Sequence, residues 1–255
     1  MTLSHKQYRY FLKDSVRLTI DFNLTDQSRG VAPPPVEKPF GADSRCIDLI
    51  PPDQWNDIPK LDLLSAIKNR KSYRQFTHEP LNLQEVSFLL WSTQGIRERA
   101  GEFTAFRTVP SAGCRHALET YLCVLNVTGL EEGIYRYLPL EHRLLVVSLQ
   151  KNLSSRITAG TLHQSFVGKA AVAFLWTTIP YRMEWRYDIA AHKVIALDAG
   201  HVCQNLYLSC AAINAGTCAI AAYDQDYMDG LLGVDGEDEF TIYLAPVGKI
   251  SNNRY

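Results

Sequence analysis

The sequence predicts an α+β fold built around a mixed sheet. The predicted strands and hairpins separate the helices in groups and do not alternate with them one by one, as a doubly wound parallel sheet would require. The chain has 255 residues, of which 46% are hydrophobic and 21% charged, so it can bury a sizeable core. These two observations favour an α+β protein with a mixed sheet.

The first 55 residues differ from the rest of the chain. They contain few periodic apolar positions, and they include Val-Ala-Pro-Pro-Pro-Val at 31–36 and Ile-Pro-Pro-Asp at 50–53. Proline-rich stretches favour extended backbone. We therefore expect an extended N-terminal arm over residues 1–55 and a folded domain over residues 56–255.

The pattern of apolar residues predicts the elements of the folded domain in order. Apolar residues that recur every three or four positions indicate helices, whereas runs of β-branched and apolar residues indicate strands. Gly95 and Gly216 lie just after two of these helices and are typical helix stops. The first predicted helix begins at 61, and the others span 83–91, 153–160, 193–214 and 226–232. The predicted strands span 120–127, 133–138, 143–149, 169–177, 217–221 and 240–245, with a hairpin turn at 139–142.

Charge and cysteine content argue against several classes of partner. There are 26 Lys and Arg residues and 27 Asp and Glu residues, so the net charge of −1 gives no long-range attraction for nucleic acid or an anionic membrane. No segment approaches the length of a membrane span, and charged residues interrupt any apolar run at the N-terminus. The six cysteines include no Cys-x-x-Cys pair. We expect a cytoplasmic protein with no metal site.

A basic block at 69–76 is the clearest candidate for a binding site. It reads Asn-Arg-Lys-Ser-Tyr-Arg-Gln-Phe and follows the first predicted helix. In extended backbone Arg70, Ser72 and Arg74 point to one side, where two guanidinium groups and a hydroxyl group could hold a phosphate. The alternative is a solvated basic loop, and the spacing alone does not separate the two interpretations.

Two further stretches could carry chemistry. The small residues of Pro110-Ser111-Ala112-Gly113 can bring backbone amides close to a flat ligand, although a plain turn has the same composition. Arg186 and Tyr187 offer a cation and a phenol beside Trp185, and the phenol could supply a proton. The alternative interpretation is that Arg186 is a surface arginine and Tyr187 an aromatic residue of an interface.

Histidines and common catalytic motifs add less. His116 and His201 could act as acids or bases, although a histidine in an apolar helix, such as His201, is more often a core residue. The chain has no Gly-x-Gly-x-x-Gly, Walker, His-Glu-x-x-His or Gly-x-Ser-x-Gly motif. The sequence therefore lacks the signatures of dinucleotide-fold, nucleotide triphosphatase, zinc protease and hydrolase chemistry.

Several motifs occur in one order along the chain. They are 70–76, 89–96, 110–113 with His116 and Glu119, 133–137, 198–201 with Gln204 and Asn205, 231–233 and 247–249. Together they resemble the nitroreductase-like FMN flavoproteins. Within that family they are most similar to the branch of SagB-type dehydrogenases and azoline oxidases of peptide natural-product pathways. The resemblance runs from about residue 61 to residue 249, and the N-terminal arm resembles that of stand-alone bacterial members.

The resemblance implies a three-layer α-β-α fold with a mainly antiparallel sheet, and an intertwined homodimer with FMN sites across its interface. The basic block would hold the phosphate and ribityl chain, and the turn at 110–113 would lie against the isoalloxazine from the partner subunit. The backbone near 220–222 would face flavin N5. The implied FMN-binding residues are Arg70, Ser72, Arg74, Pro110, Ser111, Ala112, Gly113, Ile220, Ala221, Ala222 and Lys249, with Arg254 as a further cation.

The implied reaction is ping-pong electron transfer. NAD(P)H would give a hydride to flavin N5, and a small electron-poor acceptor, such as a nitroaromatic compound or a quinone, would then take the electrons. Azoline-oxidising relatives have a Lys-Tyr pair where this chain has Arg186-Tyr187; arginine cannot act as a base near neutral pH, whereas Tyr187 could supply a proton. The alternatives are an FMN-dependent dehydrogenase of a heterocyclic or amino-acid-derived substrate and a non-catalytic flavin-binding protein.

Overall fold

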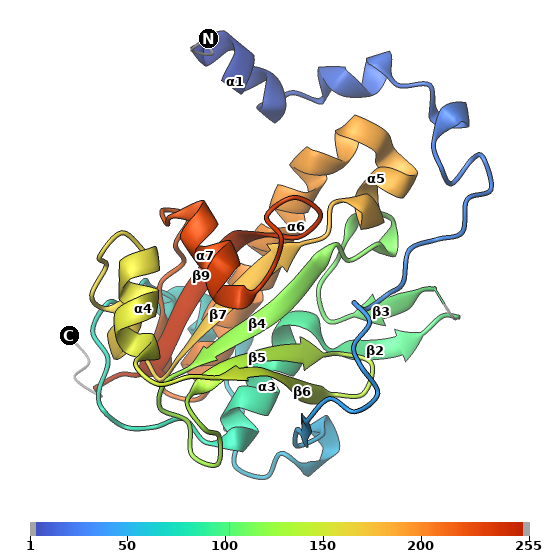
Figure 1. Ribbon diagram of the computed structural model, residues 1–255. Helices are drawn as coiled ribbons and strands as arrows, with labels where there is room; N and C mark the ends of the chain where they lie inside the picture. Colours follow the sequence, from blue (N-terminus) through green and yellow to red (C-terminus); the bar gives the residue numbers. More distant parts are fainter. Residues whose placement is uncertain (1–3, 102, 252–255) are drawn as a thin grey trace.

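The computed structural model describes residues 4–101 and 103–251. Its centre is a seven-stranded sheet in the order β1-β6-β5-β4-β7-β9-β8 (Figure 1). All neighbouring strands of this sheet pair antiparallel. Within the described residues, the parallel contacts are isolated bridges, Ser72 with Thr217 and Leu81 with Val127. The predicted α+β class is confirmed, and its sheet is antiparallel apart from such bridges.

The elements follow each other as strands and helices in groups. The α-helices are α1 (His5–Leu12), α2 (Leu63–Asn69), α3 (Leu83–Gln94), α4 (Leu153–Gly160), α5 (Tyr181–Tyr187), α6 (Ala191–Ala212) and α7 (Gln225–Leu232). The strands are β1 (Cys46–Asp48), β2 (Ile96–Arg99), β3 (Ala105–Arg107), β4 (Leu118–Val124), β5 (Gly133–Leu138), β6 (Arg143–Leu149), β7 (Val172–Thr178), β8 (Ala215–Thr217) and β9 (Phe240–Lys249). Short 3-10 helices include η1 (Asp14–Thr19), η2 (Phe22–Leu24), η4 (Ala112–Cys114) and η6 (Asp188–Ala190).

Helices cover both faces of the sheet because side chains along each strand alternate between two apolar cores. Leu122 of β4 belongs to the core that the sheet shares with α3 and α6. Its neighbour Cys123 belongs to the core that the sheet shares with α4 and α7. Figure 1 shows α4 and α7 on one side of the sheet and α3 and α6 on the other. This is the three-layer α-β-α arrangement that the resemblance implies.

Most predicted elements form within a few residues of their expected bounds. The strand expected at 217–221 forms at Ala215–Thr217, and the last strand continues past 245 to Lys249. Pro246 does not end β9, because it continues the register opposite Ala173 of β7. The pattern of apolar residues missed α5 and the β2–β3 hairpin, which are short and carry many charged or aromatic residues.

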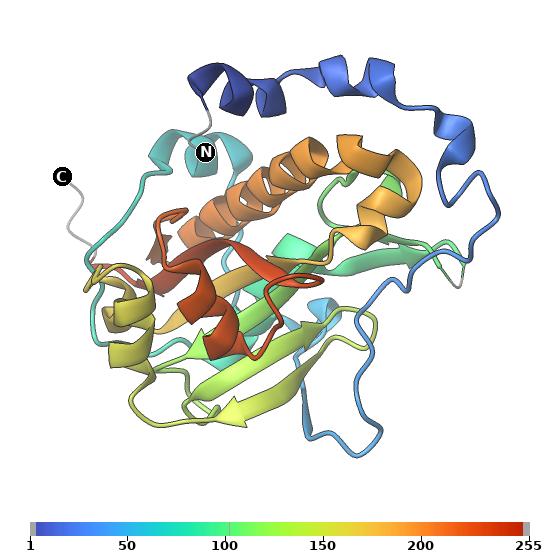
Figure 2. The same cartoon turned by 45° about the horizontal axis from the view of Figure 1, so that its top comes forward.

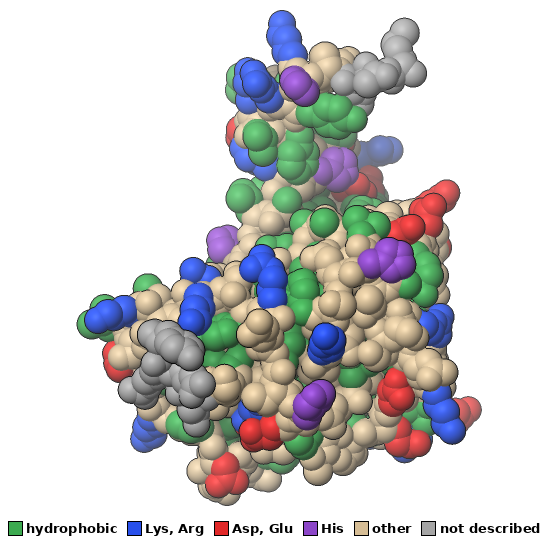
Figure 3. Space-filling view, turned by 90° about the vertical axis from the view of Figure 1, so that its left-hand side faces the viewer, with side chains coloured by type: hydrophobic (Ala, Val, Ile, Leu, Met, Phe, Trp, Pro, Cys, Tyr) green, Lys and Arg blue, Asp and Glu red, His purple; other side chains and the backbone are tan. Residues whose placement is uncertain are grey.

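The N-terminal segment is not uniformly extended, which corrects the expectation for residues 1–55. It contains α1, η1 and η2, and β1 joins the edge of the sheet by pairing with β6. Figure 2 shows the first part of this segment above α6, and Figure 3 shows it standing away from the body of the molecule. No residue of α1 is buried. The prolines at 33–35 lie in a stretch without helix or strand between these helices and β1.

Candidate functional site

The basic block lies at the edge of the sheet, directly after α2. The α2 helix begins after Asp62, whose side chain accepts a hydrogen bond from the Ser65 amide at 2.9 Å, and it ends at Arg70. Beyond that point the chain runs beside β8, because the Tyr73 amide donates to the Thr217 carbonyl oxygen at 2.9 Å. Gly216 permits this approach, since a Cβ atom there would lie 2.6 Å from the Tyr73 ring.

Tyr207 of α6 connects the basic block to the segment after β8. Its hydroxyl group lies 2.9 Å from the Ser72 hydroxyl group and accepts a hydrogen bond from the Ala219 amide at 2.8 Å. The Arg70 guanidinium group lies 5.3 Å from the centre of the Tyr207 ring. We call Arg70, Ser72, Tyr207 and Ala219 the Tyr207 cluster. The sequence gives no sign of this role of Tyr207, because a phenol in an apolar helix is compatible with a core position.

A cavity of about 750 Å³ opens beside the Tyr207 cluster. Lys68, Arg70 and Lys71 line it, and all three are exposed. Thr217 also lines it, and the buried Thr217 hydroxyl oxygen has no hydrogen-bond partner in the described structure. A group of cations beside a free hydroxyl group can bind an anion.

The other predicted cofactor residues in this part of the chain fall into two groups. Arg74 is exposed and lies 6.0 Å from the centre of the Phe166 ring, and it does not line the cavity. Ile220 pairs with Leu244 through two backbone hydrogen bonds of 2.8 and 3.2 Å. Ala221 and Ala222 follow it and are exposed. The two hydrogen bonds to Leu244 therefore fix the start of the short exposed segment at 221–222, next to the Tyr207 cluster.

Lys249 does not join this group. Its ammonium group is buried and donates to Glu85 Oε1 at 2.5 Å and to the Ile213 carbonyl oxygen at 2.8 Å. The Glu85 carboxylate thus neutralises the charge inside the molecule. The expected contribution of Lys249 to a phosphate site is not supported, and Arg254 lies outside the described residues.

The turn at 110–113 meets Arg186 and Tyr187 in the same chain. Gly113 has φ +57°, and a Cβ atom at this position would lie 2.5 Å from the Tyr187 hydroxyl oxygen and 2.9 Å from Arg186 Cδ. The Arg186 guanidinium group lies 5.6 Å from the centre of the Tyr187 ring. Close packing of the two predicted catalytic side chains on this turn therefore requires glycine.

Two buried residues, His116 and Asp198, contact the turn. The Ser111 hydroxyl oxygen accepts a hydrogen bond from the His116 amide at 2.9 Å. Asp198 of α6 lies against Ser111 and Ala112, and burial raises the pKa of its carboxyl group. Its Oδ2 atom has no hydrogen-bond partner among the described residues. We call Ser111, Gly113, Arg186, Tyr187 and Asp198 the Tyr187 cluster.

The two histidines behave differently from each other. Burial, together with Arg107, Arg115 and Arg182, lowers the pKa of His116 to about 2, so this imidazole stays neutral and cannot serve as a cationic acid near pH 7. His201 is exposed on α6, so its interpretation as a core residue is wrong. Its apolar neighbours Val202 and Leu206 are buried.

The Tyr207 and Tyr187 clusters lie at different points along α6. Asp198 and Tyr207 belong to the same helix, and at about 1.5 Å per residue they are about 14 Å apart along its axis. Within the described part of the chain, no group of three or more His, Cys, Asp or Glu side chains could hold a metal ion. Residues 4–101 and 103–251 also contain no helix that is long and apolar enough to cross a membrane.

Comparison with known proteins assigns the chain to a family. A sequence profile of the nitroreductase family matches residues 67–249. Because the match covers most of the chain, the chain belongs to the nitroreductase family, whose members are in general oxidoreductases.

Individual relatives agree with this assignment. A candidate nitroreductase of Methanocaldococcus jannaschii, MJ1384, is 30% identical over 77% of this chain and 95% of its own length. The structure of a candidate nitroreductase from Ralstonia eutropha JMP134 has a TM-score of 0.67 at 25% identity, covering 86% of this chain and 99% of that chain. One chain of the Escherichia coli microcin synthetase McbBCD complex, solved with truncated pro-MccB17 bound, shares the fold. Its TM-score is 0.61 at 19% identity, with 98% of this chain and 99% of that chain covered.

Proposed function

We propose that this chain is an FMN-dependent oxidoreductase that takes electrons from NAD(P)H and delivers them to a small electron-poor acceptor, such as a nitroaromatic compound or a quinone. Family membership supports the reaction class. The observation that carries the cofactor is the cavity beside the Tyr207 cluster, which is lined by Lys68, Arg70 and Lys71 and also by Thr217, whose hydroxyl group has no partner among the described residues. These donors fit a phosphate group. When bound, FMN supplies a ring that accepts a hydride and releases the electrons in a later step.

The residues of the Tyr207 cluster would bind and orient this cofactor. Arg70 offers charge-assisted hydrogen bonds, and Ser72 offers a hydroxyl group. The Tyr207 hydroxyl group accepts a hydrogen bond from the Ala219 amide and shares a second with the Ser72 hydroxyl group, in which either oxygen can be the donor, so it holds Ser72 in place. The exposed backbone of Ala221 and Ala222 could then approach the ring edge. Arg74, now over Phe166, would contact the cofactor from the same side.

The Tyr187 cluster would serve the second substrate. The Tyr187 hydroxyl group lies against Gly113 and could give or take a proton there, whereas Arg186 keeps its positive charge near neutral pH. A fixed cation next to this phenol favours a substrate that gains negative charge as it is reduced. Both side chains end the same helix, α5, so they move together.

We further propose a homodimer in which the Tyr187 cluster of one copy faces the Tyr207 cluster of the other. Asp198 and Tyr207 are about 14 Å apart along α6 in one chain, so the two clusters are separate along this helix. Apolar side chains of α2 beside the cavity are exposed, with Leu63 at 67%, Leu64 at 76% and Ile67 at 56%. A second copy that covered α2 would bury them.

A dehydrogenase of a heterocyclic or amino-acid-derived substrate is the second candidate. Its support is the alignment with a chain of the microcin synthetase complex, which covers 98% of this chain and therefore includes the N-terminal segment. The discriminating measurement is anaerobic mixing with NADH or NADPH. Rapid bleaching of bound flavin favours the reductase, and failure of both nucleotides to bleach it favours the dehydrogenase.

The proposed cofactor is tested by titrating the purified chain with FMN and recording its absorbance and fluorescence. Wild-type protein should bind FMN, and Arg70→Ala should bind it about 10- to 100-fold more weakly, as expected for loss of a charge-assisted hydrogen bond. Arg45→Ala is the matched control, because it removes an exposed arginine that pairs with Glu131 at the other edge of the sheet. No uptake of FMN by the wild type, or equal affinities of the two variants, would reject this assignment.

A further inference from the structure

Residues 25–38 run along α5 and bind it at several points. The Gln27 amide donates to the Trp185 carbonyl oxygen at 2.9 Å, and the Trp185 indole N–H donates to the Val31 carbonyl oxygen at 2.9 Å. Near the start of the helix, the Tyr181 hydroxyl group donates to Asp26 Oδ2 at 2.8 Å. Both the backbone and the side chain of Trp185 are therefore bound to this N-terminal stretch.

Arg115 bridges the same stretch and α5 from the opposite side. Its Nε atom donates to the Arg182 carbonyl oxygen at 3.2 Å, and its Nη2 atom donates to the Pro34 carbonyl oxygen at 3.3 Å. Its guanidinium group also lies 4.8 Å from the centre of the Trp185 ring. Arg115 is buried, so these contacts are shielded from water.

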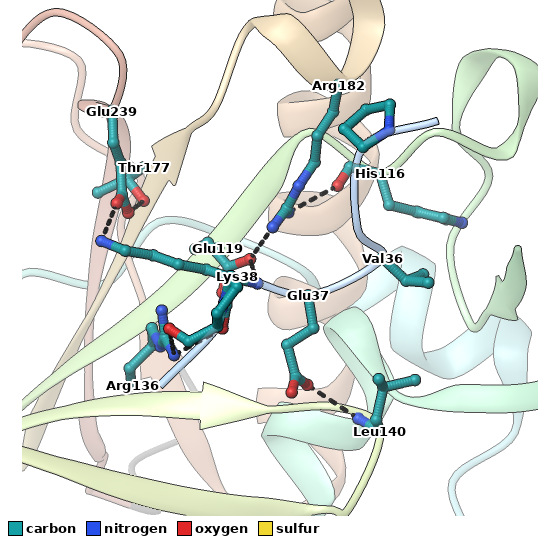
Figure 4. A network of polar contacts seen from close by, with 12 residues as sticks. Val36, Glu37, Lys38, His116, Glu119, Arg136, Leu140, Thr177, Arg182 and Glu239 are labelled. Carbon is teal, nitrogen blue, oxygen red and sulfur yellow. Dashed lines mark hydrogen bonds and ion pairs between the residues drawn. The ribbon is translucent and has the colours of Figure 1, made fainter. Parts of the chain in front are cut away.

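A buried carboxylate completes the connection (Figure 4). Glu119 Oε1 accepts hydrogen bonds from the Lys38 amide at 3.0 Å and from Arg182 Nη2 at 2.6 Å. The Arg182 and Glu119 side chains are 1% and 2% exposed. Between these points Arg107 donates to the Val36 carbonyl oxygen at 2.8 Å. The N-terminal stretch and α5 thus share one buried anion.

The α5 helix depends on such contacts because it is short. It has seven residues, and an isolated helix of that length is not stable in water. Its last two residues are Arg186 and Tyr187. Contacts that hold Trp185 therefore also set where these two side chains meet Gly113.

We infer that residues 25–38 act as a strap that positions α5, with Trp185 and Arg115 as positioning residues for Arg186 and Tyr187. Residues 25–38 are called the strap below. The inference deepens the proposed function, on which its kinetic part rests. The strap would therefore act on the reaction through α5, because none of its contacts described above is with Arg186 or Tyr187.

Hydrogen exchange of the full-length, flavin-free chain tests the strap itself. Trp185→Phe removes the indole donor to Val31 and keeps an aromatic ring beneath Arg115. Trp55→Phe is the matched control, because the Trp55 indole N–H also donates to a backbone carbonyl, that of Ile50, at 2.9 Å, away from α5. Amides 181–187 should exchange about fivefold faster in Trp185→Phe and at the wild-type rate in Trp55→Phe. Equal exchange in both variants would overturn the strap.

A second variant guards against general loss of structure. Tyr181→Phe removes the bond to Asp26 at an exposed position, so the fold does not depend on it. It should raise exchange of amides 181–187 by about twofold without changing exchange in β4 and β7. Unchanged exchange in 181–187 would also count against the strap.

Steady-state kinetics with FMN, NADH and 1,4-benzoquinone test the positioning role. Trp185→Phe should lower kcat/KM for the quinone by about fivefold while its FMN affinity and kcat/KM for NADH stay at the wild-type values, because each kcat/KM of a ping-pong reaction depends on its own half-reaction. Trp55→Phe should leave all of them unchanged. Unchanged quinone kinetics in Trp185→Phe, despite faster exchange in α5, would overturn the positioning role. Absence of FMN binding in the wild type would instead reject the proposed function, while the exchange result would still decide on the strap.

Discussion

The Tyr207 hydroxyl group lies 2.9 Å from the Ser72 hydroxyl group and accepts a 2.8 Å hydrogen bond from the Ala219 amide. A single phenol on α6 thereby holds the basic block against the segment that follows β8. These two stretches are more than a hundred residues apart in the sequence. In the proposed site they bind opposite ends of one cofactor, so the geometry of the site depends on this phenol.

Tyr207→Phe should weaken FMN binding about three- to tenfold. The substitution keeps the ring beneath Arg70 but removes the hydroxyl group, so the Ser72 hydroxyl group loses a hydrogen-bond partner and the Ala219 amide loses its acceptor. Fluorescence titration with FMN measures the effect. Tyr135→Phe is the control, because it removes a hydroxyl group on β5. That hydroxyl group donates to the Glu131 carbonyl oxygen at 2.8 Å. The same affinity in both variants would contradict this role of Tyr207.

Lys249→Met should destabilise the protein and leave FMN binding nearly intact. The substitution leaves the Glu85 carboxylate without its cation in a buried position, which costs about 3 kcal/mol of the free energy of unfolding. Urea denaturation measures this cost. Arg45→Met, which breaks an exposed ion pair with Glu131, should cost less than about 1 kcal/mol.

FMN titration of the same Lys249 variant decides between the two roles considered for this residue. Folded Lys249→Met should bind FMN with close to wild-type affinity, unlike Arg70→Ala. A loss of affinity as large as that of Arg70→Ala would mean that Lys249 contacts the phosphate after all.

Leu64→Asp should convert the proposed dimer to a monomer. Leu64 is 76% exposed on α2 beside the cavity, so a charge there costs little in a single chain and much in an interface that covers α2. Sedimentation equilibrium measures the mass. Leu162→Asp is the control, because Leu162 is also exposed, at 57%, but follows α4 on the other side of the sheet. A wild-type chain that sediments as a monomer would reject the dimer directly.

Only those parts of the proposed site that depend on local spacing could be inferred from the sequence. The basic block was found because its charges lie next to each other, and its position after a helix follows from the apolar pattern of α2. Lys249 was misplaced because its partner, Glu85, is 164 positions away, so no local pattern reveals the pair. Tyr207 was missed because a phenol in an apolar helix gives no local sign of a partner such as Ser72.

Partners that are distant in the sequence also explain which elements of the fold were not predicted. The antiparallel core strands have long apolar patterns, and they were predicted within a few residues. The α5 helix is short, and it is held by the strap and by Glu119, which lie far from it in the sequence. The prolines at 33–35 lie in a stretch without helix or strand. They carried no information on the pairing of β1 with β6.

Gly113→Ala should destabilise the protein by about 2 kcal/mol more than Gly129→Ala. Both glycines have positive φ, +57° and +88°, so alanine is strained at either position. Only at Gly113 would the new Cβ atom meet other groups, at 2.5 Å from the Tyr187 hydroxyl oxygen; at Gly129 nothing lies within 4 Å. Urea denaturation compares the two. Adding Tyr187→Phe to Gly113→Ala should recover part of the loss, and equal costs for the two glycines would contradict the contact.

Glu37→Gln should stabilise the protein at pH 8 and change little at pH 4.5. Burial raises the pKa of Glu37 from 4.5 to about 7, because the Leu140 amide and Arg107 only partly offset the loss of water. The folded state therefore keeps its proton in a range of pH where the unfolded chain has lost it. The resulting stabilisation is fully present below pH 4.5 and is lost as the pH rises to about 7, a decrease of about 3 kcal/mol.

Glutamine removes this dependence, since its amide oxygen can still accept from Leu140 without carrying a charge. Urea denaturation between pH 4.5 and 8 measures the effect as a flatter stability profile for Glu37→Gln than for the wild type. Glu131→Gln is the control, because the Glu131 side chain is 62% exposed and should give a profile parallel to that of the wild type. Because Glu37 belongs to the strap, its ionisation should also loosen α5. Parallel profiles for the wild type and Glu37→Gln would show that Glu37 does not titrate in this range.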